Sequence, residues 1–145
     1  MAQIVRLRAN AIEAAEQTER LTVPEVRQPV ELAKLLADWP ADRRLLMADE
    51  TGGGPPIAEA LSALDEQARA APWAILIGPE GGFSAGELGL LRRMKDVVSV
   101  GLGPRILRAD TAALAALACW QALVGDWRKP TPRLTHDYRT SKAIV

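Results

Sequence analysis

One glycine-rich stretch, I-G-P-E-G-G-F-S at positions 77–84, combines bare main chain with a carboxylate. Gly81 and Gly82 carry no side chain, so they leave the backbone open to close approach by a ligand. Glu80, set between the glycines, could serve as a general base, anchor a ligand, or cap main-chain N–H groups. The alternative is an ordinary tight turn between a strand and a helix.

A second stretch, from Gly101 to Leu107, offers bare backbone of the same kind. It is not a dinucleotide-binding fingerprint, because Ile106 stands where the third glycine would be. Its N–H and C=O groups can hydrogen-bond the edge of a base, with Leu102, Ile106 and Leu107 as apolar walls. This chemistry fits a ligand that contains adenine.

Two arginines accompany the second stretch. Arg105 lies within it and Arg108 follows it, beside the start of a predicted helix. A guanidinium next to a helix N-terminus attracts phosphate groups. The alternative is that one of the two arginines pairs with Asp110 or Glu80.

Other catalytic arrangements are excluded by residue type. His136 is the only histidine and lies in the C-terminal tail, so no Ser/His/Asp or Cys/His arrangement is expected. Cys119 is the only cysteine, which excludes an internal disulfide and a cysteine-based zinc site. The carboxylates show no ligand spacing, so no metal site is expected.

The pattern of apolar residues predicts helices that alternate with strands. Short apolar runs bounded by glycine or proline are typical of buried strands, and apolar residues at helical spacing indicate helices that pack on a sheet. The helices are expected at 3–20, 29–40, 57–70, 84–95 and 111–124, and the extended segments at 23–26, 45–48, 74–77 and 97–102. This order predicts an α/β fold, a mostly parallel sheet with helices on both faces and 74–77 as its central strand.

Local signals mark the ends of two of these helices. Ser84 with Glu87 three residues later is a capping-box signature, so a helix should begin there. Asp110 is expected to cap the helix at 111–124, which is almost wholly apolar, and Gly125 is expected to end it. A helix apolar on so many sides must be buried on more than one face. The sheet covers one face, and a partner subunit is one candidate to cover another.

Both glycine-rich stretches follow predicted strands and should therefore lie at the same, carboxyl edge of the sheet. In open α/β sheets this edge is where ligands bind. A third stretch, T-G-G-G-P-P at 51–56, lacks the Lys and Ser/Thr of a phosphate-binding loop and is interpreted as a plain loop.

Composition predicts one globular domain of 145 residues, 48% hydrophobic and 25% charged. Neither a membrane-spanning run nor a signal-peptide core is found, so a cytoplasmic location is expected. Residues 1–91 carry 8 basic and 14 acidic side chains, whereas residues 92–145 carry 10 and 4. The basic half suggests a patch for a polyanion, and solvated helix faces with a basic tail would account for it equally well.

Together these motifs resemble the RsmE family of 16S ribosomal RNA uridine-N3 methyltransferases. The resemblance is carried by I-G-P-E-G-G-F-S-A-G-E at 77–87 and L-G-P-R-I-L-R-A-D-T-A at 102–112. Three earlier segments are also similar: A-I-E-A-A-E-Q-T at 11–18, V-P-E-V at 23–26 and the E-T-G-G-G loop. The match therefore runs from residue 3 to about residue 127, in order and at the right separations.

The resemblance implies a SPOUT fold with a C-terminal trefoil knot, which holds S-adenosyl-L-methionine, and a homodimer. It implies 16S rRNA or the small ribosomal subunit as substrate, with no metal and no membrane. The cofactor pocket that it implies consists of Leu76, Gly78, Glu80, Gly81, Gly82, Leu102, Gly103, Ile106 and Leu107. The substrate-facing and catalytic candidates that it implies are Arg108, Arg105, Thr111 and Glu80.

The resemblance also implies a difference from the family. Members carry an N-terminal PUA-like barrel, and residues 1–127 correspond to a methyltransferase domain shortened at its N-terminus, followed by an extended or mobile tail at 128–145. Two other functions stay open: a knotted methyltransferase with another RNA target, ribose 2′-O or tRNA, and an inactive module that binds cofactor or RNA.

Overall fold

The computed structural model describes residues 2–130. It divides the chain into two compact units, Met1–Trp39 and Pro40–Val145, and the predicted tail at 128–145 falls almost entirely outside the described residues. No helix between residues 2 and 130 has the length and apolar character that crossing a bilayer would require. All candidate site residues belong to the second unit.

The first unit contains helices α1 (Ala2–Gln17) and α2 (Leu32–Ala37). The chain leaves α1 through Glu19, which has a positive φ of 54°. The extended segment at 23–26 forms no strand, contrary to expectation. Its Pro24 has no N–H to donate to a ladder, and the carbonyl oxygen of Val26 instead accepts a hydrogen bond from Arg8 in α1 at 3.3 Å.

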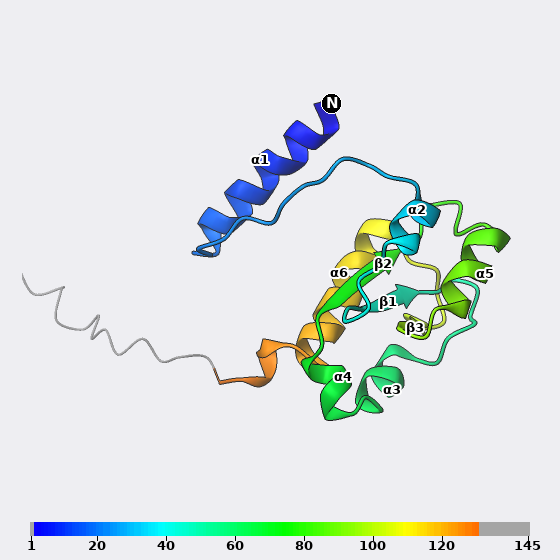
Figure 1. Cartoon of the computed structure of the whole chain (residues 1–145). Helices are drawn as coiled ribbons and strands as arrows, with labels where there is room; N and C mark the ends of the chain where they lie inside the picture. The colour runs from blue at the N-terminus through cyan, green and yellow to red at the C-terminus, as the bar shows by residue number, and fades with distance from the viewer. Residues whose placement is uncertain (1, 131–145) are drawn as a thin grey trace, which may run out of the picture. The chain divides into compact units, whose positions relative to one another are not determined.

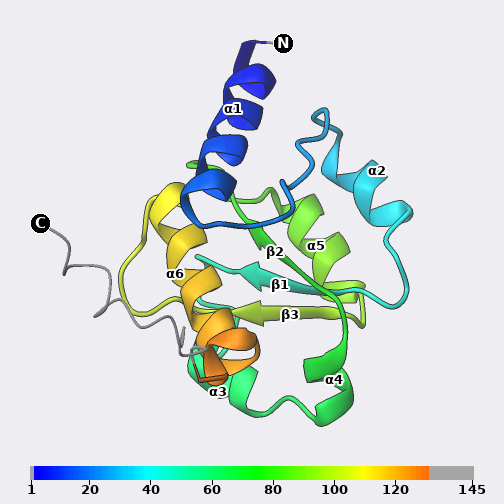
Figure 2. The same ribbon diagram turned by 90° about the vertical axis from the view of Figure 1, so that its left-hand side faces the viewer.

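The second unit contains a parallel sheet of three strands within the described residues: β1 (Arg44–Ala48), β2 (Trp73–Ile77) and β3 (Val97–Val100). Their order is β2-β1-β3, as Figure 2 shows. The predicted parallel α/β architecture is confirmed. The prediction that 74–77 is the central strand is wrong, because β1 lies between the others and is buried from Leu45 to Ala48, whereas β2 is only half-buried.

One face of the sheet is covered by α3 (Ile57–Ser62) and α6 (Ala109–Leu123). Leu46 of β1 lies opposite Ile75 of β2 and Val98 of β3, and all three belong to the core that packs against these helices. Side chains alternate between faces along a strand. The opposite face is covered by α5 (Ala85–Arg93) (Figure 1). This helix contacts β3, and its Leu91 is completely buried.

The capping box at the start of α5 is confirmed. The side chain of Ser84 accepts a hydrogen bond from the main-chain N–H of Glu87 at 3.2 Å, and Glu87 accepts one from the N–H of Ser84 at 2.8 Å. The N–H and the hydroxyl of Ser84 both donate to the Glu87 carboxylate at 2.8 Å and lower its pKa below the ordinary value. The start of α5 is therefore fixed immediately after the first glycine-rich stretch.

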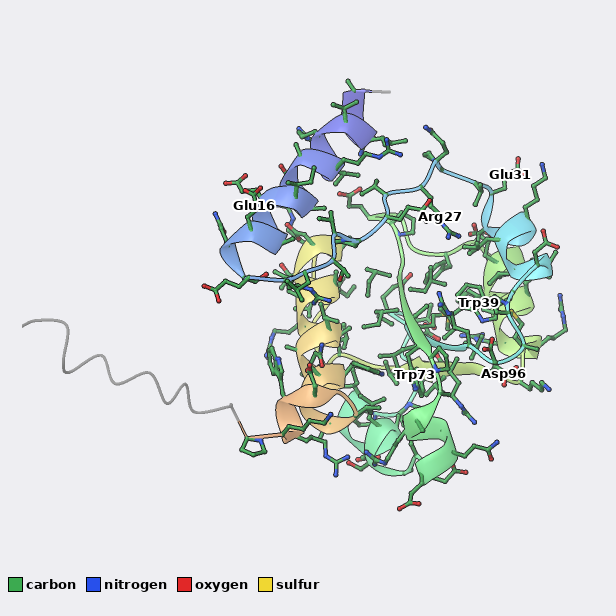
Figure 3. The ribbon with its side chains drawn as sticks, turned by 60° about the vertical axis from the view of Figure 1, so that its left-hand side comes forward. Glu16, Arg27, Glu31, Trp39, Trp73 and Asp96 are labelled. Carbon is green, nitrogen blue, oxygen red and sulfur yellow. The ribbon has the colours of Figure 1, made fainter. Side chains whose placement is uncertain are left out.

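The helix predicted over 57–70 is instead two short helices, α3 and α4 (Glu66–Ala70). Asp65 interrupts the predicted helix because its side chain accepts a hydrogen bond from the N–H of Ala68 at 2.7 Å, which makes it the N-cap of α4. The next strand begins directly after α4 with Trp73, labelled in Figure 3, whose indole N–H donates to the carbonyl oxygen of Ala68 at 2.9 Å.

The start of α6 also differs from expectation. Arg108, not Asp110, occupies the N-cap position, and it contributes no side-chain cap. Asp110 lies inside the first turn and accepts a hydrogen bond from the N–H of Thr111 at 2.8 Å. Past the helix, the N–H of Gly125 bonds the carbonyl oxygen of Trp120 at 2.9 Å, and the chain continues into the 3-10 helix η1 (Asp126–Arg128).

Candidate functional site

A cavity of about 510 Å³ lies at the carboxyl edge of the sheet in the second unit. It is lined by the ends of β1 and β2 and by the segments that follow all three strands: 48–52 for β1, 77–80 with Gly82 for β2, and 101–109 for β3, together with Ala112 of α6. The expectation that the two glycine-rich stretches meet at one edge is confirmed. The volume is within the range of pockets that enclose a small molecule.

The cavity brings together nine of the residues that the sequence had put forward for the site. Those that line it are Gly78, Glu80, Gly82, Leu102, Gly103, Arg105, Ile106, Leu107 and Arg108. Three others do not line it. Leu76 pairs with Met47 within the sheet, and Thr111 is exposed on α6. Gly81 faces open space, since a Cβ at this position would have no atom within 4 Å.

The wall that sequence reasoning missed is the segment after β1. Asp49, Glu50, Thr51 and Gly52 all line the cavity, so two residues of the stretch interpreted as a plain loop lie at the candidate site. The signal that could have found this wall is the acidic pair directly after a buried strand.

This segment is attached to the sheet at its far end. The N–H of Gly101 bonds the carbonyl oxygen of Pro55 at 2.8 Å, and the N–H of Ile57 bonds the carbonyl oxygen of Gly101 at 3.0 Å. A Cβ at Gly54 would lie 2.6 Å from the main-chain carbonyl of Ser99, so only glycine allows the loop to lie this close to β3. The third glycine-rich stretch is therefore built for contact with the sheet.

Asp49 holds the near end of the same segment. Its side chain is fully buried and accepts hydrogen bonds from four donors: the N–H of Thr51 at 2.9 Å, the hydroxyl of Thr51 at 2.5 Å, Ser99 Oγ at 3.1 Å and Arg92 Nη2 at 3.2 Å. These donors come from the loop itself, from β3 and from α5. A single carboxylate thus joins one wall of the cavity to a strand and to the helix on the other face.

The ionisation of Asp49 follows from this environment. Burial acts to raise the pKa of its carboxyl, but the hydrogen bonds from Thr51, Arg92 and Ser99 outweigh burial and hold the pKa below its ordinary value of 3.8. The carboxylate form is therefore the one that the fold stabilises.

Replacing Asp49 with asparagine should lower the free energy of unfolding at pH 7 by about 2 kcal/mol, since Arg92 loses its charged partner and the amide nitrogen cannot accept the bonds made to one of the two oxygens. Because the folded pKa of Asp49 is depressed, its contribution is present above the unfolded pKa and is lost as pH falls through the folded pKa. Urea unfolding of both proteins between pH 2 and 7 should show the difference between them shrinking below about pH 4. A difference that stays constant with pH would contradict this role.

Glu50 lies across the first glycine-rich stretch. Its Oε1 accepts a hydrogen bond from the N–H of Phe83 at 3.3 Å. A Cβ at Gly82, which has a φ of +71°, would clash with the same oxygen, and a Cβ at Gly78 would lie 3.4 Å from Oε2. The missing side chain at Gly82 therefore makes room for Glu50, whereas a Cβ at Gly78 would press first against the ring of Phe83, at 3.1 Å.

The second glycine-rich stretch leaves its main chain available. Within residues 2–130, the backbone from 102 to 107 donates no hydrogen bond to other residues and accepts none. Gly103 adopts a φ of +104°, a conformation that other residues rarely reach. These groups can therefore bond the edge of a base, as the residue types predicted.

The arginines of this stretch have no acidic partner among the described residues. Neither arginine forms an ion pair within residues 2–130, so the alternative in which Arg105 or Arg108 pairs with Asp110 or Glu80 is not realised there. Both guanidinium groups are exposed at the cavity. The site thus combines unpaired backbone, apolar walls and two cations.

Residues 1–121 match the RNA methyltransferase domain family. The chain belongs to this family. The resemblance to RsmE is confirmed, since 119 residues are 38% identical to ribosomal RNA small subunit methyltransferase E of Rickettsia conorii, over 79% of this chain and 45% of that protein. The Bacillus subtilis protein of the same name is 37% identical over 109 residues, 74% of this chain and 42% of that protein.

A solved structure supports the same assignment. Ribosomal RNA small subunit methyltransferase E from Neisseria gonorrhoeae, bound to S-adenosyl methionine, superposes with a TM-score of 0.69 at 29% identity, over 84% of this chain and 48% of that one. The chain thus spans about half the length of the relatives that it matches.

Proposed function

We propose that this chain is an S-adenosyl-L-methionine-dependent RNA methyltransferase that methylates N3 of a uridine in 16S ribosomal RNA. The observation that carries the proposal is the convergence of the two family motifs, at 78–82 and 101–108, on one cavity at the carboxyl edge of the sheet. The Neisseria relative, which has the same name as the curated relatives, is a complex with this cofactor. A cytoplasmic location follows from the proposed substrate.

The hydrogen-bonding groups and the apolar residues that line the cavity are of the kinds that would bind the adenosyl group of the cofactor. The unpaired backbone at 102–107 can bond the edge of the adenine, and Leu102, Ile106 and Leu107 can cover its faces. When bound, the cofactor supplies a methyl group that is already activated on a sulfonium. The remaining task of this chain is alignment, which can contribute roughly 7–11 kcal/mol when reactants are well oriented.

Arg105 and Arg108 are proposed to act on the RNA. Uridine N3 must lose its proton before or during attack, and the negative charge spreads onto the flanking carbonyl oxygens. A guanidinium at the rim of the cavity can stabilise that charge as it develops. Arg108 is the proposed electrostatic catalyst, Arg105 the contact to the RNA backbone, and Glu80 a residue that anchors the ligand.

The C-terminal part of the second unit is proposed to form a trefoil knot, and α6 to contact a second copy of the chain. In support, the large apolar side chains of Leu114 and Leu117 on α6 are 71% and 49% exposed. The small residues Ala112 and Ala116 of the same helix are the ones buried against the rest of the unit. An exposed apolar stripe of this kind is typical of a helix with a partner.

The test is transfer of a labelled methyl group from the cofactor to small ribosomal subunits, followed by digestion to nucleosides. Label in 3-methyluridine is expected. Label in a 2′-O-methylated nucleoside, or in tRNA alone, would favour a related methyltransferase with another target. Cofactor binding without any transfer would favour the inactive module.

A further inference from the structure

Glu50 is an acidic residue of the cavity that, unlike Asp49, has no ion-pair partner within residues 2–130 and is held in place by main-chain contacts. Its neighbour Asp49 is held by four hydrogen bonds, and its own Oε1 accepts one from Phe83 at 3.3 Å. The carboxylate lies over Gly82, where a side chain would collide with it, and within contact distance of a Cβ placed at Gly78. Its place at the wall of the cavity is therefore set by both loops.

The charge of Glu50 is nonetheless unpaired. No ion pair to Glu50 is formed within residues 2–130, and its Oε2 has no hydrogen-bond donor among them. The two arginines of the cavity belong to the loop after β3, whereas Glu50 belongs to the loop after β1. The cavity thus has a cationic segment and, on the loops after the other two strands, two carboxylates without an ion pair within residues 2–130, Glu80 and Glu50, of which only Glu50 accepts a hydrogen bond there.

We infer that the Glu50 carboxylate faces the positively charged sulfonium of the bound methyl donor and so makes the cavity prefer the charged cofactor to its neutral product. This inference rests on the proposed function. Opposite charges within a few ångströms attract, and the attraction is stronger when the ligand excludes water from between them. Transfer of the methyl group converts the sulfonium to a neutral thioether, which removes this attraction and favours release of the product.

The experiment compares three ligands by calorimetry, in the parent chain and in Glu50→Gln. S-adenosylmethionine carries the sulfonium, sinefungin carries an ammonium at that place, and S-adenosylhomocysteine carries a neutral sulfur. All three share the adenosine and the amino acid. The glutamine oxygen can still accept the hydrogen bond from Phe83, so the change removes the charge and keeps the shape.

Glu50→Gln is expected to weaken binding of the two cationic ligands at least about fivefold and to leave S-adenosylhomocysteine within about twofold. Glu59→Gln, an exposed change in α3 away from the cavity, is the matched control and should change none of the three affinities. Because the neutral ligand reports on the intact pocket, loss of structure and loss of charge are separated.

Equal weakening of all three ligands would overturn the inference, since that result indicates support of the loop or a contact with the shared amino group. Unchanged binding of all three would overturn it as well. If the parent chain bound none of the ligands, the proposed function itself would fail, and the inference with it.

Discussion

Replacing Arg108 with alanine is expected to lower the rate of methyl transfer by about 100- to 1000-fold, the loss typical of removing one group that stabilises developing negative charge. Arg108 lines the cavity, is exposed, and forms no ion pair within the described residues. Only its main chain is used by the fold, as its carbonyl oxygen accepts a hydrogen bond from Ala112 at 2.8 Å. The change should therefore leave stability intact and cofactor affinity within about twofold.

The measurement is single-turnover transfer from labelled cofactor to small ribosomal subunits, with cofactor affinity determined separately by calorimetry. Arg108→Lys, which keeps the charge but loses the planar fork, should retain part of the rate. Arg93→Ala, an exposed change at the end of α5, should have no effect on it. A near-normal rate for Arg108→Ala would remove this residue from the mechanism.

Among the partly exposed side chains, Arg69 is the one whose replacement is expected to lower the free energy of unfolding most. Its guanidinium donates to four main-chain carbonyl oxygens: Leu123 at 2.7 Å, Leu61 at 2.8 Å, and Ser62 and Leu64 at 3.0 Å each. It thereby caps the ends of α3 and α6 together and complements the negative end of both helices.

Arg69→Ala should lower the free energy of unfolding by about 3 kcal/mol, because a charged donor is lost and partly buried carbonyls are left unpaired. The donors of lysine all sit on one nitrogen, which cannot reach all four oxygens at once. Arg69→Lys should therefore recover less than half of the loss. Urea unfolding at pH 7 measures both, with Arg93→Ala as the matched control. A loss below about 1 kcal/mol for Arg69→Ala would mean that α6 is held by packing alone.

Local signals predicted most of the elements. The three strands were placed from short apolar runs, and the start of α5 from Ser84 and Glu87, because these depend on neighbouring residues alone. The same reasoning failed at 23–26, where a proline disrupts pairing, and at 57–70, where Asp65 competes for a main-chain N–H and divides the helix.

The parts that could not be predicted depend on residues far apart in the chain. Asp49 meets Arg92 across 43 positions, and Arg69 meets Leu123 across 54. The order β2-β1-β3 also depends on long-range pairing, so the strand with the clearest motif at its end was taken for the centre. The reason for glycine at position 82 becomes visible only with Glu50 in place.

The central claim is that the loops after the strands close around the adenosyl group of a methyl donor. Amide NMR signals of the glycines, followed during titration with S-adenosylmethionine, test it most directly. Five glycines line the cavity: Gly52, Gly78, Gly82, Gly101 and Gly103. Gly86 and Gly89 of α5 and Gly125 after α6 lie outside it and serve as internal controls.

We expect the signals of Gly78, Gly82, Gly101 and Gly103 to shift together and to saturate with one cofactor per chain, while the signals of Gly86, Gly89 and Gly125 stay in place. Shifts confined to the three control glycines, or no shift at millimolar cofactor, would contradict the claim.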